Sequence, residues 1–228
     1  MSSPFGSNWV YLKAELAWLD RLLMRAITRQ QQNQKVVNRV AQTAADRASS
    51  HWWQGFVNID PSQGGSMIKV TPVSHHPRGR YGDRLQSSQE QGVVLAIPDL
   101  CQKLNLRSWE RNTLILCLAP EINRRYEKLY AYLNGDETNC RQPTVDLALR
   151  LFCPSDAAWC EARPSFSAKA PLLKHRLIEL HDSPSTARSL LSKVLVMPPK
   201  AVSHCLAEQA PPEKFLPKPR SRAQAKLN

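Results

Sequence analysis

Residues 104–151 constrain the fold of this chain more than any other stretch, because apolar spacing, helix caps and turn residues agree there. Leu114 to Leu118 form an unbroken apolar run that is typical of a buried helix. Apolar residues at spacings of three and four between Ile122 and Leu133 indicate a second helix. Asn134-Gly135 should end it, since glycine tolerates the left-handed conformation that closes a helix. The segment predicts a compact helical core.

Further elements are expected after this core. Thr144 is placed to cap a helix from Val145 to Phe152. Residues 176–180 and 190–196 have the apolar pattern of two strands separated by turn residues, and Pro198-Pro199 begins a last helix. The expected fold class is therefore mainly α with a small β-hairpin (α+β).

A long amphipathic helix is predicted at the N-terminus. Its apolar residues recur at spacings of three and four: Trp9, Leu12, Leu16, Leu19, Leu23 and Ile27. The charged residues assigned to its opposite face are Lys13, Glu15, Asp20, Arg21, Arg25 and Arg29. This helix could dock on the core that follows it or form a short coiled coil. An apolar seam shorter than about four heptads favours docking.

The net charge and the spacing of the cysteines limit the functions that this chain can have. The 228 residues carry a formal net charge of +12, which favours nucleic acid, an anionic membrane or an acidic protein as a partner. The excess lies on the first helix and the C-terminal tail, whereas the core is nearly neutral. The six cysteines form no C-x-x-C pair, so we expect reduced thiols, no metal site and no cofactor. No signal peptide or membrane span is recognisable, which predicts a cytoplasmic protein without a membrane partner.

Residues 57–92 are rich in Gly, Pro, Ser and Gln, and this composition predicts a flexible polar linker. His75-His76 lacks the neighbouring ligands of a metal site. A small basic and aromatic strip in this segment comprises Arg78, Arg80, Tyr81 and Arg84. One aromatic residue is a poor platform for stacking bases, so the strip is interpreted as a solvated loop.

Three runs in the core carry a family resemblance: Leu106 to Glu121, Arg125 to Leu133 and Arg141 to Ala148. They resemble the winged-helix domain that precedes the ATPase domain in a bacterial family of AAA+ ATPases. That family includes the ATPases encoded with phage-tail-like contractile injection systems. Shorter matches occur at Trp9-Val10-Tyr11-Leu12 and Ala170-Pro171-Leu172-Leu173. The resemblance implies that the predicted hairpin is the wing.

The sequence pattern, together with the resemblance for residues 93–210, predicts a domain organisation. Residues 1–56 would be an amphipathic helical segment packed on the core, and residues 57–92 the flexible linker. Residues 93–210 would form the winged-helix-like domain, and residues 211–228 a disordered, basic, proline-rich tail. The 228 residues contain no G-x-x-x-x-G-K-[ST] motif, the loop with which such ATPases hold phosphates. We therefore expect that this chain does not hydrolyse ATP and is not an enzyme.

Two functions follow as alternatives. The first is a protein-interaction or recruitment module, whose partner could be an AAA+ ATPase or an injection-system component. Arg124, Arg125 and Lys128 share an exposed helix face and are its candidate partner surface. The second is a DNA-binding winged helix, with weak and salt-sensitive binding through the wing and the basic tail. Its candidate nucleic-acid contacts are Lys174, Arg176, Arg188 and Lys193.

The helix from Val145 to Phe152 is predicted as the recognition helix of the DNA-binding alternative. It would present Asp146 and a single arginine, Arg150. Reading base edges calls for Arg, Lys, Asn or Gln, and contact with phosphates calls for positive charge. The sequence therefore favours protein interaction over DNA binding.

Overall fold

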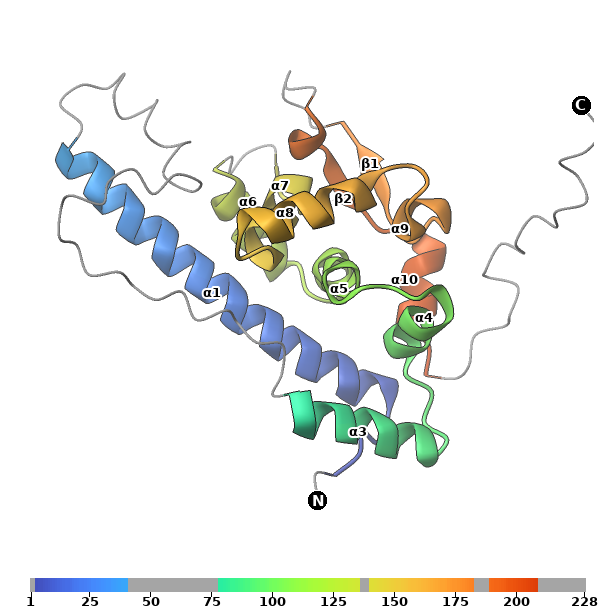
Figure 1. The fold of residues 1–228 in the computed structure, drawn as a ribbon. Coiled ribbons are helices and arrows are strands. Elements are labelled where there is room, and N and C mark those ends of the chain that lie inside the picture. The colour runs from blue at the N-terminus through green and yellow to red at the C-terminus, as the bar shows by residue number, and fades with distance from the viewer. Residues whose placement is uncertain (1–2, 41–77, 136–139, 183–188, 209–228) are drawn as a thin grey trace, which may run out of the picture.

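The computed structural model describes residues 3–40, 78–135, 140–182 and 189–208. The structure is mainly helical with one small antiparallel sheet, so the predicted fold class is confirmed (Figure 1). The elements follow in the order α1 (Asn8–Val40), α3 (Arg78–Glu90), α4 (Ala96–Leu104), α5 (Ser108–Ile122), α6 (Arg125–Asn134), α7 (Val145–Phe152), α8 (Asp156–Ala162), η1 (Arg163–Phe166), α9 (Pro171–Lys174), β1 (Glu179–His181), η2 (Leu190–Ser192), β2 (Val194–Val196) and α10 (Pro199–Leu206).

Helix α5 is the centre of the hydrophobic core. Its residues Leu114 to Ala119 are at most 4% exposed, and α1, α6, α7 and α10 all pack against it. Figure 1 shows α5 nearly end-on, between α1 and the C-terminal elements. The helix is apolar on every side along this stretch, which is the pattern of a helix surrounded by others. Gly135 ends α6 with a φ of 72°, as the sequence predicts.

Helix α1 docks on the core of its own chain. Its buried face is made of Tyr11, Leu12, Trp18, Leu19, Leu22 and Leu23. Trp18 stacks on Phe152 of α7 with 6.2 Å between ring centroids. The side-chain amide of Asn8, at the start of α1, donates hydrogen bonds of 2.9 Å to the carbonyl oxygens of Cys205 and Ala207. The beginning of α1 is thereby tied to the last helix of the fold.

The predicted wing is a short hairpin. Strands β1 and β2 pair antiparallel, with Leu180 opposite Leu195. Thr144, directly before α7, forms an isolated bridge with Val194 and so adds a third extended segment beside β2. The Thr144 hydroxyl also accepts a hydrogen bond of 3.1 Å from the Leu147 amide, which makes it the predicted cap of α7.

The predicted flexible linker is wrong at its C-terminal end, because residues 78–90 form helix α3. Tyr81 packs edge-on against Phe5 with 5.5 Å between centroids. Arg84 lies 4.0 Å from the centroid of the same ring and donates to the Ser3 carbonyl oxygen. The Ser88 hydroxyl accepts a hydrogen bond of 2.7 Å from the Phe5 amide. Contacts with the first residues of the chain therefore stabilise a segment whose composition is that of a loop.

The assignment of Glu15 to the solvated face of α1 is also wrong. Its side chain is fully buried, and it accepts hydrogen bonds from the Arg111 guanidinium and the Tyr81 hydroxyl. Arg111 also donates to the Tyr11 hydroxyl over 3.1 Å. Burial and the nearby Glu15 carboxylate raise the pKa of Tyr11. A buried ionic cluster therefore joins α1, α3 and α5.

Within the described ranges, no helix is long and apolar enough to cross a membrane. All six cysteines are free thiols.

Candidate protein-interaction surface

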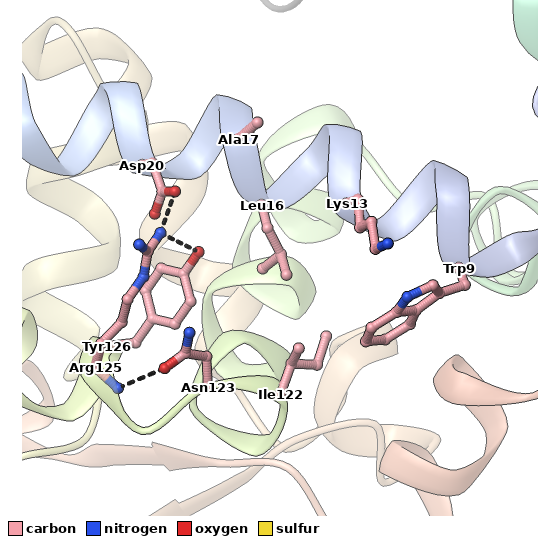
Figure 2. Close-up of a pocket in the computed structure, with 9 residues that line it drawn as sticks. All are labelled: Trp9, Lys13, Leu16, Ala17, Asp20, Ile122, Asn123, Arg125 and Tyr126. Atoms are coloured by element: carbon pink, nitrogen blue, oxygen red, sulfur yellow. Dashed lines mark hydrogen bonds and ion pairs between the residues drawn. The ribbon is translucent and has the colours of Figure 1, made fainter.

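An open groove of about 410 Å³ lies between α1 and the junction of α5 with α6. Figure 2 shows Leu16 and Asp20 of α1 pointing toward Ile122 and Arg125 of the opposite wall. The groove is lined by Trp9, Lys13, Leu16, Ala17, Asp20, Ile122, Asn123, Arg125 and Tyr126.

The two walls follow from the local structure. On α1, residues 9, 13, 16, 17 and 20 recur at helical spacings, so they share one side of the helix. On the opposite wall, α5 ends at Ile122 and the backbone of Asn123 is extended, with φ −150° and ψ 115°. The Asn123 side-chain oxygen then accepts a hydrogen bond of 3.0 Å from the Arg125 amide as α6 begins. This sharp junction presents Ile122 toward Leu16, and the two side chains form the apolar floor (Figure 2).

An ion pair closes one end of the groove. The Arg125 guanidinium of α6 donates to the Asp20 carboxylate of α1 and lies 3.5 Å from the Tyr126 hydroxyl. Hydrogen bonds with Tyr126 and with Asp20 raise the pKa of Arg125, so it stays charged. Burial raises the pKa of Tyr126 to about 12, so this hydroxyl stays protonated.

Basic side chains lie in the groove and on the adjoining start of α6. Lys13 lies 5.8 Å from the centroid of the Trp9 ring. Arg124, whose side chain is 86% exposed, is 3.6 Å from Glu127, and Lys128 is exposed on the next turn of α6. The structure thus places the predicted partner residues Arg124, Arg125 and Lys128 together at the start of α6, and it brings Arg125 into the groove.

Exposed large apolar side chains also occur on α1, and one of them, Trp9, lines the groove. Among the described residues, the large hydrophobic side chains that face solvent are Trp9, Val10 and Met24, which are 39%, 45% and 55% exposed. All three belong to α1. An apolar surface with a polar or charged rim is typical of a protein-interaction site.

The predicted recognition helix is wrong. Helix α7 is followed by three residues and then by α8, so α7 is the first helix of a helix-turn-helix pair. Its residues Val145, Leu147, Ala148 and Leu149 are buried in the core. In a helix-turn-helix, the second helix enters the DNA groove while the first crosses the backbone. The position of the recognition helix therefore belongs to α8.

Helix α8 has the wrong chemistry for reading DNA. Its sequence, DAAWCEA, contains no Arg, Lys, Asn or Gln. Asp156 and Glu161 are both exposed, and Glu161 accepts a hydrogen bond of 2.6 Å from Arg107. The side chains that contact bases and phosphates in the major groove are absent, and the exposed carboxylates would repel phosphates.

Of the predicted nucleic-acid contacts that the structure describes, Lys174 and Arg176 precede β1, and Lys193 lies at the loop end of the hairpin. Lys174 is exposed at the end of α9, and Arg176 is exposed in a turn with φ 51°. Lys193 pairs with Asp182 across the hairpin. Arg188 lies outside the described residues. In the portion that the structure covers, no group of three or more His, Cys, Asp or Glu side chains could hold a metal ion.

The sequence did not reveal the groove itself. Trp9 was assigned to the apolar face that docks on the core, and Asp20 to a solvated face. The Asp20 and Arg125 pair spans 105 residues, and no local pattern connects its partners. The available signal was the position of Trp9 at the end of the apolar stripe, where fewer core residues can cover it.

The family model "Winged helix domain, variant" matches residues 1–217. The match covers most of the chain, which therefore belongs to this winged-helix family. It includes α1 and α3 as well as the helices and hairpin that follow. No curated protein and no solved structure matched the chain.

Proposed function

We propose that this protein is a non-catalytic winged-helix module that recruits a protein partner through the groove between α1 and α6. Its resemblance to the domain that precedes the motor in AAA+ ATPases suggests the partner. We expect an AAA+ ATPase or a component of a contractile injection system to be recruited or positioned by this module.

The observation that carries the proposal is the exposure of Trp9 beside the groove. A tryptophan that is 39% exposed contributes a large apolar surface, and this residue type is enriched among the residues that dominate binding energy. Leu16 and Ile122 extend the apolar surface into the groove (Figure 2). Lys13 in the groove, with the exposed Arg124 and Lys128 on the adjoining part of α6, favours a partner segment with apolar and acidic side chains.

The chemistry of α8 supports protein interaction over DNA recognition. The second helix of the helix-turn-helix pair presents Asp156 and Glu161 where a DNA-binding protein presents basic or amide side chains. Two buried or half-buried aromatic residues, Trp159 and Phe166, hold this region against the domain.

A variant that obstructs the groove tests the proposal. Ala17 is exposed and lines the groove, so Ala17→Arg adds a long charged side chain at the edge of the groove without disturbing the core. The matched control is Ala157→Arg on the exposed face of α8. Affinity purification of the tagged full chain from cells that naturally produce it, followed by mass spectrometry, compares both variants with the wild type.

The proposal predicts that one specific protein copurifies with the wild type and with Ala157→Arg but is lost with Ala17→Arg. Loss with Ala157→Arg and retention with Ala17→Arg would move the interaction to α8. Copurification of a defined DNA sequence, rather than a protein, would replace the proposal with the DNA-binding alternative.

A further inference from the structure

The second half of α1 carries basic side chains and no acidic ones. Arg21, Arg25 and Arg29 are all exposed, and no carboxylate pairs with them in the described part of the chain. They are spaced four residues apart, so they follow one edge of the helix at intervals of about 6 Å. From Arg21 to Val40 the sequence contains five Lys and Arg residues and no Asp or Glu.

The acidic residues of α1 are already engaged elsewhere. Glu15 is buried against Arg111 of α5, and Asp20 binds Arg125 of α6. Other arginines in the fold also have carboxylate partners, such as Arg150 with Asp146 at 2.7 Å. Arg21, Arg25 and Arg29 have no such ion pair among the described residues, and like charges at this spacing repel one another along a helix.

Helix α1 continues beyond this edge. The side-chain amide of Gln30 donates a hydrogen bond of 3.2 Å to the Tyr132 carbonyl oxygen, near the point where α1 leaves α6. Figure 1 shows α1 continuing past the other helices beyond this point. The exposed Gln31 and Gln32 follow Gln30, and amide side chains can donate hydrogen bonds to phosphate oxygens.

We propose that the Arg21, Arg25 and Arg29 edge of α1 binds the phosphodiester backbone of nucleic acid without reading its sequence. A regular row of cations can neutralise phosphates and release their counterions, and this binding requires no contact with bases. The site is separate from the wing, and the acidic α8 helix takes no part in it. It is also independent of the proposed protein groove.

The test is a fluorescence anisotropy titration of the full chain over a series of salt concentrations. The probes are a short labelled DNA duplex and a single-stranded RNA of equal length, which distinguish the two sources of phosphodiester. The variant is Arg21→Gln/Arg25→Gln/Arg29→Gln, which removes charge while keeping good helix formers. The matched controls are Arg220→Gln/Arg222→Gln/Lys226→Gln in the tail and Lys174→Gln/Arg176→Gln beside the wing.

The proposal predicts that the wild type binds at low salt, and that the α1 variant lowers affinity at least about tenfold. The slope of log affinity against log salt should fall in magnitude by about 3, or about 0.9 for each lost phosphate contact. Far-UV circular dichroism should show an unchanged helical fold. Each single variant, Arg21→Gln, Arg25→Gln or Arg29→Gln, should lower the magnitude of this slope by about 1.

Two results would overturn the proposal. One is a wild-type chain that binds neither probe at low salt, which would leave an acidic protein surface as the ligand of this edge. The other is an α1 variant with wild-type affinity and slope, with the loss found instead in the tail or wing control. Trp9→Ala, which removes groove surface without changing charge, should leave nucleic-acid binding unchanged, so failure of the groove proposal is distinguishable from failure of this one.

Discussion

The Arg111 guanidinium of α5 donates a hydrogen bond to the fully buried carboxylate of Glu15 on α1. The Tyr81 hydroxyl of α3 donates to the same carboxylate, and the Tyr11 hydroxyl accepts from Arg111 over 3.1 Å. A single ionic cluster thus fixes α1, which carries one wall of the candidate groove, to the central helix of the core.

Replacing Glu15 should destabilise the fold strongly. Glu15→Ala leaves the Arg111 charge largely buried without its carboxylate, and breaking a buried pair in this way costs about 3 to 5 kcal/mol. The control Asp99→Ala removes the partner of Lys103 in an exposed pair of 2.9 Å and should cost at most about 1 kcal/mol. Urea unfolding followed by circular dichroism measures both. Equal effects in the two variants would contradict a structural role for the Glu15 cluster.

The Glu15 cluster illustrates what sequence could not provide. A charged residue on an amphipathic helix is normally solvated, and its partner Arg111 lies 96 residues away. The helices around α5, by contrast, were predictable, because Leu114 to Leu118 and the Thr144 cap carry local signals that the structure confirms. Local pattern defined these elements, whereas the pairing of distant charges required the tertiary fold.

Two glycine substitutions should have opposite effects. Gly135 ends α6 with a φ of 72°, so Gly135→Ala forces an alanine into the left-handed region and should lower stability by about 1 kcal/mol. Gly82 lies inside α3 with open space around its Cα, so Gly82→Ala should raise stability by about 0.5 to 1 kcal/mol. Thermal unfolding compares the pair, and destabilisation by Gly82→Ala would contradict the helical assignment of residues 78–90.

Stability should decrease in mild acid because of His204. Burial lowers the pKa of His204, an effect that Asp99 opposes and Lys103 reinforces. The unfolded chain therefore takes up a proton as the pH falls through about 6.5, before the folded protein does, and the free energy of unfolding decreases. His204→Gln should reduce this decrease when urea unfolding is measured between about pH 7.5 and about pH 5. An unchanged pH dependence in His204→Gln would leave His175, whose pKa burial also lowers, as its source.

The cysteines should differ sharply in reactivity. Burial raises the pKa of Cys117, and it raises that of Cys205 to about 12, so both thiols stay protonated and shielded from solvent. Cys160 is exposed on α8. Alkylation of the native protein near neutral pH, followed by peptide mass spectrometry, should label Cys160 first and the two buried thiols only after denaturation. Rapid native labelling of Cys205 would show that α10 opens away from α1 and α4.

The errors in the sequence interpretation have specific causes. Helix α3 has few apolar residues, and Tyr81 becomes part of the core only because Phe5 and Tyr11 lie beside it. The cap and apolar period of residues 145–152 predict a helix there, whereas the sequence analysis places no helix over the seven residues of α8. The order of the two helices around their turn, which assigns the recognition position to α8, is a property of the fold.

Site-specific photocrosslinking tests the central claim, that the α1 and α6 groove recruits a protein, most directly. Benzoylphenylalanine would replace Lys13 in the groove in one sample and Ala157 on α8 in the other, in cells that naturally produce the chain. The account predicts a discrete protein adduct from position 13, diminished by Arg124→Glu/Lys128→Glu, and none from position 157. A DNA adduct from position 157, together with no adduct from position 13, would contradict the account.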